Sequence, residues 1–294
     1  IATYFSLSKI LWLLRNVDEV NKAKLDKDLC FGTVDSWLLY KLTGNHVTDV
    51  TNASRTLLMD LNTLNWMENV IDKLNIPLDS LPLINPSMFN YGTNEDILKN
   101  VPITAVLGDQ QASLFGQNCI SPGDVKNTYG TGCFALTNTG TEIVHSNNGL
   151  LSTVAYQKDG DKPQYAIEGS VSIAGAAVQW LRDNLSIIKD SSDVEALAMS
   201  EKDNGDVYFV PAFSGLFSPH WDETARGVLV GLSRFTNKSH IARAVLESVA
   251  YQSNELLESM EKDIGITFET VNVDGGMIIN NLLMQFQSDI FNKK

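Results

Sequence analysis

The sequence predicts an α/β protein, and two observations carry that prediction. Short apolar runs of strand length alternate with segments whose apolar side chains recur at helical spacing. Glycine-rich turns separate several of these segments. The 294 residues are enough for two domains. We place the boundary near the turn Ser-Pro-Gly-Asp at residues 121–124, so that the first domain covers residues 1–118 and the second covers residues 119–294.

The composition excludes several classes of function. The chain is 44% hydrophobic and 19% charged, which fits a protein with ordinary cores. Its net charge of −13 argues against a nucleic-acid partner and against an anionic membrane surface. No apolar run is long enough to span a bilayer, and the three cysteines have no metal-ligand spacing. We therefore expect a cytoplasmic protein with neither nucleic acid nor membrane as partner.

In the first hundred residues, apolar spacing predicts helices joined by irregular connections. A helix is expected over residues 6–22 and another over residues 32–44, where Gly44 ends it. The polar residues 51–55 suit a loop that faces a ligand or a neighbouring domain. A further helix is expected over residues 69–74.

Beyond residue 100, predicted strands alternate with predicted helices. A buried strand is expected at residues 103–107, and further strands at residues 133–137, 151–156, 165–168, 207–212, 227–231 and 268–273. Helices are expected at residues 170–185 and 240–260, and a last one follows the turn Asp-Gly-Gly at residues 274–276.

The strongest candidate for chemistry follows the expected strand at residues 103–107. That run ends at Gly108, and Asp109 comes next, followed by Gln110 and Gln111. A hydroxyl that attacks a phosphoryl group needs a carboxylate at a fixed strand end to accept or orient its proton. The alternative is an aspartate that caps the helix after it. Position alone favours neither interpretation.

A glycine-rich turn and two glycine–amide pairs indicate a nucleotide site. In Tyr-Gly-Thr-Gly at residues 129–132, backbone N–H groups and the Thr131 hydroxyl can converge on phosphate oxygens, although such a turn alone is more typical of a hairpin. Gly175 with Gln179, and Gly276 with Asn280, are each four residues apart and so share a helix face. One such pair is more typical of tight helix packing, but two pairs in one domain favour a nucleotide between them.

Other common sites are not supported by the motifs. No Gly-Lys-Ser or Gly-Lys-Thr follows a strand, and Gly-x-Gly-x-x-Gly does not occur. The four histidines are scattered without ligand spacing, so neither a metal cage nor a histidine base is favoured.

Longer runs resemble the FGGY family of carbohydrate kinases. Residues 4–16 and 227–247 are similar to the two signatures of the family. Residues 31–37, 51–56, 108–111, 126–134 and 273–281 resemble the members that phosphorylate glycerol, so the resemblance spans almost the whole chain. It implies two ribonuclease H-like domains, as in actin and hexokinase, with substrate and ATP in the cleft between them.

Carried over position by position, the resemblance implies roles for the candidates. Asp109 would be the general base that takes a proton from glycerol, and Tyr4, Gln110 and Phe134 would bind glycerol with it. The implied nucleotide-binding positions are Thr131, Gly175, Gln179, Gly276 and Asn280. The expected reaction is ATP-dependent phosphorylation of glycerol to sn-glycerol 3-phosphate, with ATP and Mg²⁺ as cofactors.

Departures from the family pattern qualify this expectation. Family members begin with a phosphate- and magnesium-binding turn and an Arg-Glu pair for glycerol, and both would precede Ile1. We therefore expect a fragment with an incomplete first domain and a truncated second, inactive alone, of a protein that is a homo-oligomer at full length. The magnesium ligands are unknown. Patterns for a phosphorylated histidine and for a fructose bisphosphate loop are absent from residues 89–99.

Two alternatives stay open. The protein could be another sugar or polyol kinase of the family, or the chain as it stands could be a non-catalytic nucleotide-binding module.

Overall fold

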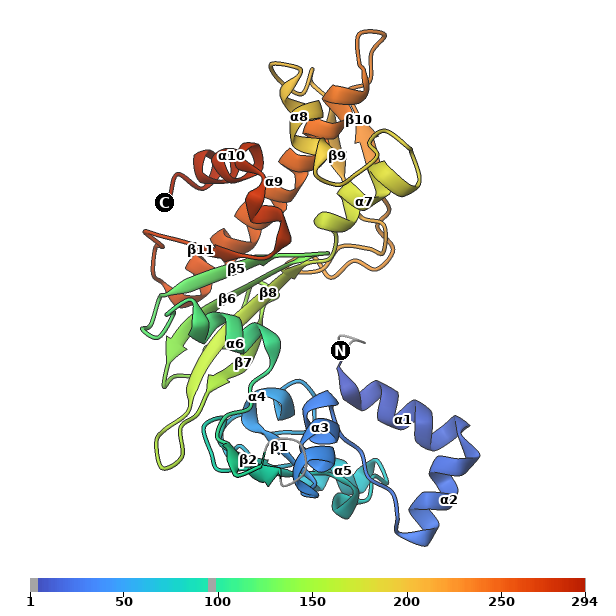
Figure 1. The fold of residues 1–294 in the computed structure, drawn as a ribbon, viewed down its shortest axis with the longest axis vertical. Coiled ribbons are helices and arrows are strands. Elements are labelled where there is room, and N and C mark those ends of the chain that lie inside the picture. Colours follow the sequence, from blue (N-terminus) through green and yellow to red (C-terminus); the bar gives the residue numbers. More distant parts are fainter. Residues whose placement is uncertain (1–4, 95–98, 294) are drawn as a thin grey trace. The chain divides into compact units, whose positions relative to one another are not determined.

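The computed structural model describes residues 5–94 and 99–293 and divides the chain into two compact units (Figure 1). Unit 1 comprises Ile1–Ala112, Thr141–Ile143 and Thr153–Ala166; unit 2 comprises Ser113–Gly140, Val144–Ser152 and Ile167–Lys294. The predicted α/β class is confirmed, since helices and strands build both units. The chain first passes from unit 1 to unit 2 after Ala112, whereas the first domain was predicted to end at residue 118. The limits of the functional domains stay a prediction. Tyr4, predicted to bind glycerol, lies outside the described residues. So do residues 95–98, which are part of the segment compared with the fructose bisphosphate loop.

Unit 1 contains short helices and two strand pairs. Its helices are α1 (Ser6–Asn16), α2 (Asp18–Asp26), α3 (Val34–Thr43), α4 (Val50–Ala53), α5 (Glu68–Lys73) and the 3₁₀ turn η1 (Leu78–Ser80). Strands β1 (Val47–Asp49) and β2 (Leu83–Asn85) pair in parallel, and β3 (Gly92–Asn94) pairs antiparallel with β4 (Val101–Ile103). Helix α6 (Asp109–Gly116) begins in unit 1 and ends in unit 2.

Three predictions for this region are wrong. The single helix over residues 6–22 is broken at Val17, whose extended backbone ends α1, and Asp18 and Glu19 then open α2 at the end where acidic side chains stabilise a helix. Residues 50–53 are helical rather than a loop, because Asp49 caps α4.

The third concerns residues 103–107, which are not a buried strand. Strand β4 ends at Ile103, and Thr104 and Val106 make only isolated backbone hydrogen bonds to Phe89 and Ser87. Val106 packs half-buried against a small apolar cluster, so its hydrophobicity reflects side-chain packing rather than a strand ladder. By contrast, the predicted helices that became α3 and α5 are confirmed, and Gly44 ends α3 with a left-handed φ of 75°.

Unit 2 is organised around a five-stranded sheet with strand order β11-β5-β6-β8-β7 (Figure 1). The strands are β5 (Val125–Tyr129), β6 (Cys133–Gly140), β7 (Leu151–Tyr156), β8 (Gln164–Val171) and β11 (Asn272–Asp274); β7 and β8 also reach into segments of unit 1. Strands β9 (Tyr208–Val210) and β10 (Val228–Val230) form a separate antiparallel pair. The helical elements are α7 (Gly175–Asp183), α8 (Asp193–Met199), α9 (Lys238–Ile264), η2 (Gly276–Ile279) and α10 (Asn281–Phe291).

The predicted strands of unit 2 are found, with shifted ends, but β5 was not predicted. Its sequence Val-Lys-Asn-Thr-Tyr has three polar residues in the middle, which hides the usual apolar signal. Lys126 is nevertheless fully buried, because its ammonium donates to the Thr128 hydroxyl at 2.7 Å and to the Phe134 carbonyl at 3.2 Å. Satisfying the charge in this way removes most of the cost of burying it.

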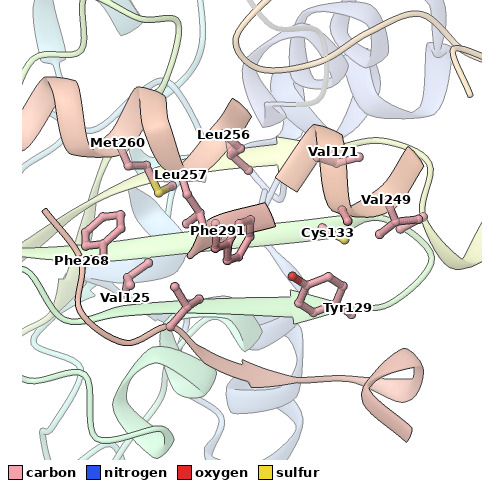
Figure 2. Close-up of a cluster of buried hydrophobic side chains, with 14 of the residues drawn as sticks. Val125, Tyr129, Cys133, Val171, Val249, Leu256, Leu257, Met260, Phe268 and Phe291 are labelled. Carbon is pink, nitrogen blue, oxygen red and sulfur yellow. The ribbon is translucent and has the colours of Figure 1, made fainter. Parts of the chain in front are cut away.

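The main core of unit 2 lies between this sheet and helices α9 and α10. Figure 2 shows Val249, Leu256, Leu257 and Met260 of α9 facing the strands that carry Val125, Tyr129 and Cys133. Helix α9 is 27 residues long, and its ends are fixed by a capping box of Asn237 and His240 at its start and by Gly265 in a left-handed conformation after its last turn. Burying each large apolar side chain contributes about 1.5–3 kcal/mol, so this interface holds the sheet in place.

The cysteines provide a direct check of this core. Cys30 is exposed, whereas Cys119 and Cys133 are buried. Burial raises the pKa of the Cys133 thiol to about 12 and also raises the pKa of Cys119. We expect iodoacetamide at pH 8 to label only Cys30 in the native chain and all three thiols after unfolding, as read by mass spectrometry. Rapid native labelling of Cys133 would contradict the packing in Figure 2.

Among the described residues, no helix is both long and apolar enough to cross a bilayer.

Candidate active site

All five residues predicted to bind nucleotide line one pocket of unit 2. The pocket has a volume of about 380 Å³. It is bounded by the β5–β6 turn, the start of α7, part of α8 and the segment from η2 to α10. The five predicted residues in its wall are Thr131, Gly175, Gln179, Gly276 and Asn280. Such a concave site, with apolar walls and a few polar groups, has the form of a small-molecule site.

The turn at residues 130–132 is a hairpin turn that is also bonded to helix α7. The amides of Ala174 and Ala176 donate to the carbonyl of Thr131 at 2.9 and 3.1 Å, and the amide of Gly175 donates to the carbonyl of Gly130 at 3.0 Å. The Thr131 side chain is exposed. The hairpin interpretation of this turn is therefore confirmed, since it connects β5 to β6. The turn also presents a threonine at the pocket, and its role in binding phosphate stays a prediction.

The glycines of the pocket have two different physical roles. A Cβ on Gly175 would lie 2.6 Å from the Gly130 carbonyl oxygen, so only glycine fits between the turn and α7. A Cβ on Gly276 would meet nothing within 4 Å. Gly276 is thus not required by the packing of the protein, and it leaves an open wall against which a flat ligand can lie.

The sequence spacing implied that the two glycine–amide pairs are equivalent, but the structure shows that they differ. Gly175 and Gln179 do lie on one helix, α7, where the Gln179 side chain is exposed. Gly276 instead opens the 3₁₀ turn η2, and Asn280 caps α10 by accepting the Leu283 amide at 2.8 Å. The prediction of a shared helix face is therefore wrong for the second pair, although both residues line the pocket.

The strand that leads into the pocket, β11, is fixed by a half-buried polar cluster. Asp274 precedes Gly275 and accepts hydrogen bonds from Ser113 of α6 at 2.6 Å and from Gln117, the residue after α6, at 3.4 Å. Burial alone would raise the pKa of Asp274, but its hydrogen bonds and the nearby Lys126 ammonium outweigh burial and lower it. The carboxylate is therefore held ionised and ties α6 to β11.

Asp109 is the first residue of α6, and its side chain is exposed. Its carboxylate accepts the Gln110 backbone amide at 2.9 Å, as an acidic group at a helix start commonly does. The amide of Gly108 donates to the Thr51 hydroxyl at 2.8 Å. Helix-end stabilisation and proton transfer are compatible at this position, so the role of general base stays a prediction.

The expected glycerol residues come from different parts of the chain. Gln110 follows Asp109 in unit 1, whereas Phe134 lies half-buried on β6 of unit 2. Their grouping with Tyr4 in one substrate site stays a prediction.

Sequence reasoning missed other residues at these sites. Glu195 of α8 lines the unit 2 pocket and accepts the Leu282 amide at 2.9 Å. Asp49 lies beneath the turn that carries Asp109, through Thr51. The pattern Asp-x-Thr-Asn at residues 49–52 could have indicated Asp49 as a helix cap, but its burial depends on tertiary packing.

Within the described ranges, three or more histidine, cysteine, aspartate or glutamate side chains nowhere gather as a metal site. A magnesium ion bound to a nucleotide needs only one or two protein carboxylates, because phosphate oxygens and water complete its coordination. The acidic and amide side chains present are thus compatible with a metal that enters with the nucleotide.

Both parts of the chain match models of one family. Residues 1–116 match the N-terminal domain of the FGGY family of carbohydrate kinases, and residues 125–294 match its C-terminal domain. The chain is 57% identical to the glycerol kinase of Brucella anthropi and 55% identical to that of Methylobacterium radiotolerans, over 99% of its own length in each case. It spans 59% of the length of each of these relatives.

Solved structures give the same result. The crystal structure of Plasmodium falciparum glycerol kinase with ADP matches with a TM-score of 0.89 and 44% identity, over 99% of this chain and 59% of that one. Ligand-bound xylulose kinase from Lactobacillus acidophilus matches with a TM-score of 0.84 and 25% identity, over 98% of this chain and 59% of that one. The chain belongs to the FGGY family of carbohydrate kinases.

Proposed function

We propose that the protein containing this chain transfers the γ-phosphoryl group of ATP to glycerol and forms sn-glycerol 3-phosphate. The observation that carries the proposal is the gathering of five separately predicted nucleotide residues in one pocket of unit 2. The similarity to glycerol kinases at 55–57% identity supports glycerol as the substrate.

In the proposed reaction, ATP lies in the unit 2 pocket, with its phosphates at the turn of residues 130–132 and its base near Gly276 and Asn280. Asp109 accepts the proton of a terminal glycerol hydroxyl as that oxygen attacks the γ-phosphorus, and the bond from phosphorus to the ADP oxygen breaks. Gln110 and Tyr4 orient that terminal hydroxyl, and Phe134 forms an aromatic wall of the glycerol pocket. Bound Mg²⁺ would offset charge on the phosphate oxygens.

A substrate panel tests the choice of glycerol within the family. We expect kcat/KM of the complete protein for glycerol to exceed the values for xylulose, ribulose and gluconate by at least about 10²-fold, because a site built to pair three hydroxyls rejects substrates that leave its polar groups unpaired. Coupled ADP release measures all four sugars and polyols under the same conditions. A higher kcat/KM for a pentose would favour the alternative of another sugar or polyol kinase.

The second alternative is a non-catalytic nucleotide-binding module. It predicts that the 294-residue chain binds ADP but turns over no phosphoryl acceptor by itself. Robust formation of sn-glycerol 3-phosphate by this chain alone, detected by mass spectrometry, would contradict it. A cytoplasmic location and a homo-oligomeric state accompany the kinase proposal as predictions for the complete protein.

A further inference from the structure

A fully buried carboxylate lies beneath the turn that carries Asp109. Asp49, the last residue of β1, is 0% exposed. It accepts hydrogen bonds from the Thr51 amide at 3.0 Å, the Thr51 hydroxyl at 2.8 Å and the Ser87 hydroxyl at 2.8 Å. Asn52 adds its backbone amide at 2.9 Å and its side-chain amide at 2.8 Å. Burial raises the pKa of Asp49, although these bonds favour the ionised form.

Capping of α4 explains only part of this arrangement. A helix cap requires the backbone amides of Thr51 and Asn52, and Asp49 accepts both. The Thr51 hydroxyl is not needed for the cap. Its single proton is donated to Asp49, so a lone pair is left to accept the Gly108 amide at 2.8 Å. Asp49 thereby orients a hydroxyl that holds the residue immediately before Asp109.

A second set of bonds reaches the same turn from the other side. The Gln111 side chain, 2% exposed, donates to the Thr153 hydroxyl at 3.3 Å. Thr153 shares a hydrogen bond of 2.8 Å with Ser54, and Ser54 donates to the Thr51 carbonyl at 2.6 Å. Both sets of bonds end on Thr51, so Gly108 and Gln111 are both fixed to helix α4. Asp109 and Gln110, which lie between them, remain accessible to solvent.

The turn is closely packed at Gly108. A Cβ on Gly108 would lie 2.6 Å from the Gln111 amide oxygen. Because the half-buried Gly108 and the buried Gln111 are both hydrogen-bonded, the backbone position of Asp109 depends on this network, while its carboxylate accepts, among the described residues, only the neighbouring Gln110 amides. Supporting a reacting group by packed, hydrogen-bonded neighbours is how enzymes keep it within reach of its substrate.

We propose that Asp49 and Thr51 are positioning residues that set the place of Asp109 through the Thr51–Gly108 hydrogen bond. This inference rests on the proposed function, in which Asp109 is the base. It predicts that loss of the Thr51 hydroxyl slows the chemical step while leaving nucleotide binding intact.

The test compares two chemically identical changes in the complete protein. Thr51→Val removes the hydroxyl that links Asp49 to Gly108. Thr48→Val removes a hydroxyl that is equally buried and donates to the Asp35 carboxylate at 2.6 Å, but that does not bond the turn. We expect Thr51→Val to lower kcat by about 10–100-fold, since misplacement by roughly 1 Å can cost 10²-fold. Thr48→Val should stay within about threefold of the wild type, and Thr51→Ser, which keeps the hydroxyl, should recover most of kcat.

The readouts separate positioning from general loosening. KM for ATP should change by less than about twofold in all three variants, and thermal unfolding should show Thr51→Val and Thr48→Val to be similarly stable. If Thr51→Val cannot be obtained folded, Thr51→Ala removes the same hydroxyl with less bulk. A Thr51→Val enzyme with unchanged kcat, a Thr48→Val enzyme slowed equally, or no recovery in Thr51→Ser would overturn the inference.

Asp109→Asn, assayed in parallel, keeps the two proposals distinct. If Asp109→Asn is inactive and Thr51→Val is fully active, only the positioning role fails. If Asp109→Asn is fully active, the proposed base itself is wrong.

Discussion

Replacement of Asp109 by Asn should lower kcat for glycerol phosphorylation by about 10²–10⁴-fold, the usual contribution of a positioned general base. This substitution separates the two roles open to Asp109. Asparagine stabilises a helix start about as well as aspartate, and its amide oxygen can still accept the Gln110 backbone amide. It cannot accept a proton from a hydroxyl. The loss of the negative charge at the start of α6 should cost at most about 1 kcal/mol of stability.

The matched control is Asp18→Asn. Asp18 is also an exposed aspartate at the first position of a helix in unit 1, α2. Steady-state kinetics of both variants in the complete protein, with thermal unfolding and ADP binding measured alongside, should show lost turnover only for Asp109→Asn. Equal activity of the two variants would leave Asp109 with a helix-end role alone.

Replacement of Gly175 by Ala should abolish tight nucleotide binding and destabilise unit 2. Its Cβ would lie 2.6 Å from the Gly130 carbonyl, so the hairpin turn and α7 must separate. Overpacking of this kind costs about 1–3 kcal/mol. It would also break the bonds that hold Thr131 at the pocket. We expect the Kd for ADP to rise by at least about 10²-fold, with a lower Tm, measured by calorimetry on the 294-residue chain.

Gly276→Ala is the informative partner of that variant. Because nothing lies within 4 Å of the added methyl, the fold should be unchanged in Tm. If a nucleotide rests on Gly276, its Kd should still rise about 10-fold, since the methyl can clash only with the ligand. Gly116→Ala, which also meets nothing within 4 Å and lies outside the pocket, should change neither quantity. Wild-type ADP affinity in Gly276→Ala would place the nucleotide away from this wall.

Part of the fold could be predicted because its signals are local, and Gly44 ends α3 as expected. The glycine and amide positions selected in the sequence line one pocket, and their binding of a nucleotide stays a prediction. Strand β5 was not predicted, because the burial of Lys126 depends on Thr128 and Phe134 accepting its protons. Local polarity could not reveal that compensation.

The sequence by itself determined the α/β class and the resemblance to the family, and that resemblance implied most of the candidate residues. The order of residue types on which they depend is the same in any conformation of the chain. Only the tertiary structure decided that Gly175 is closed by packing while Gly276 is open, and that Thr51 holds Gly108, 57 residues away along the chain. A hydrogen bond or a steric limit between distant segments exists only once packing brings their atoms together, so no local pattern encodes it.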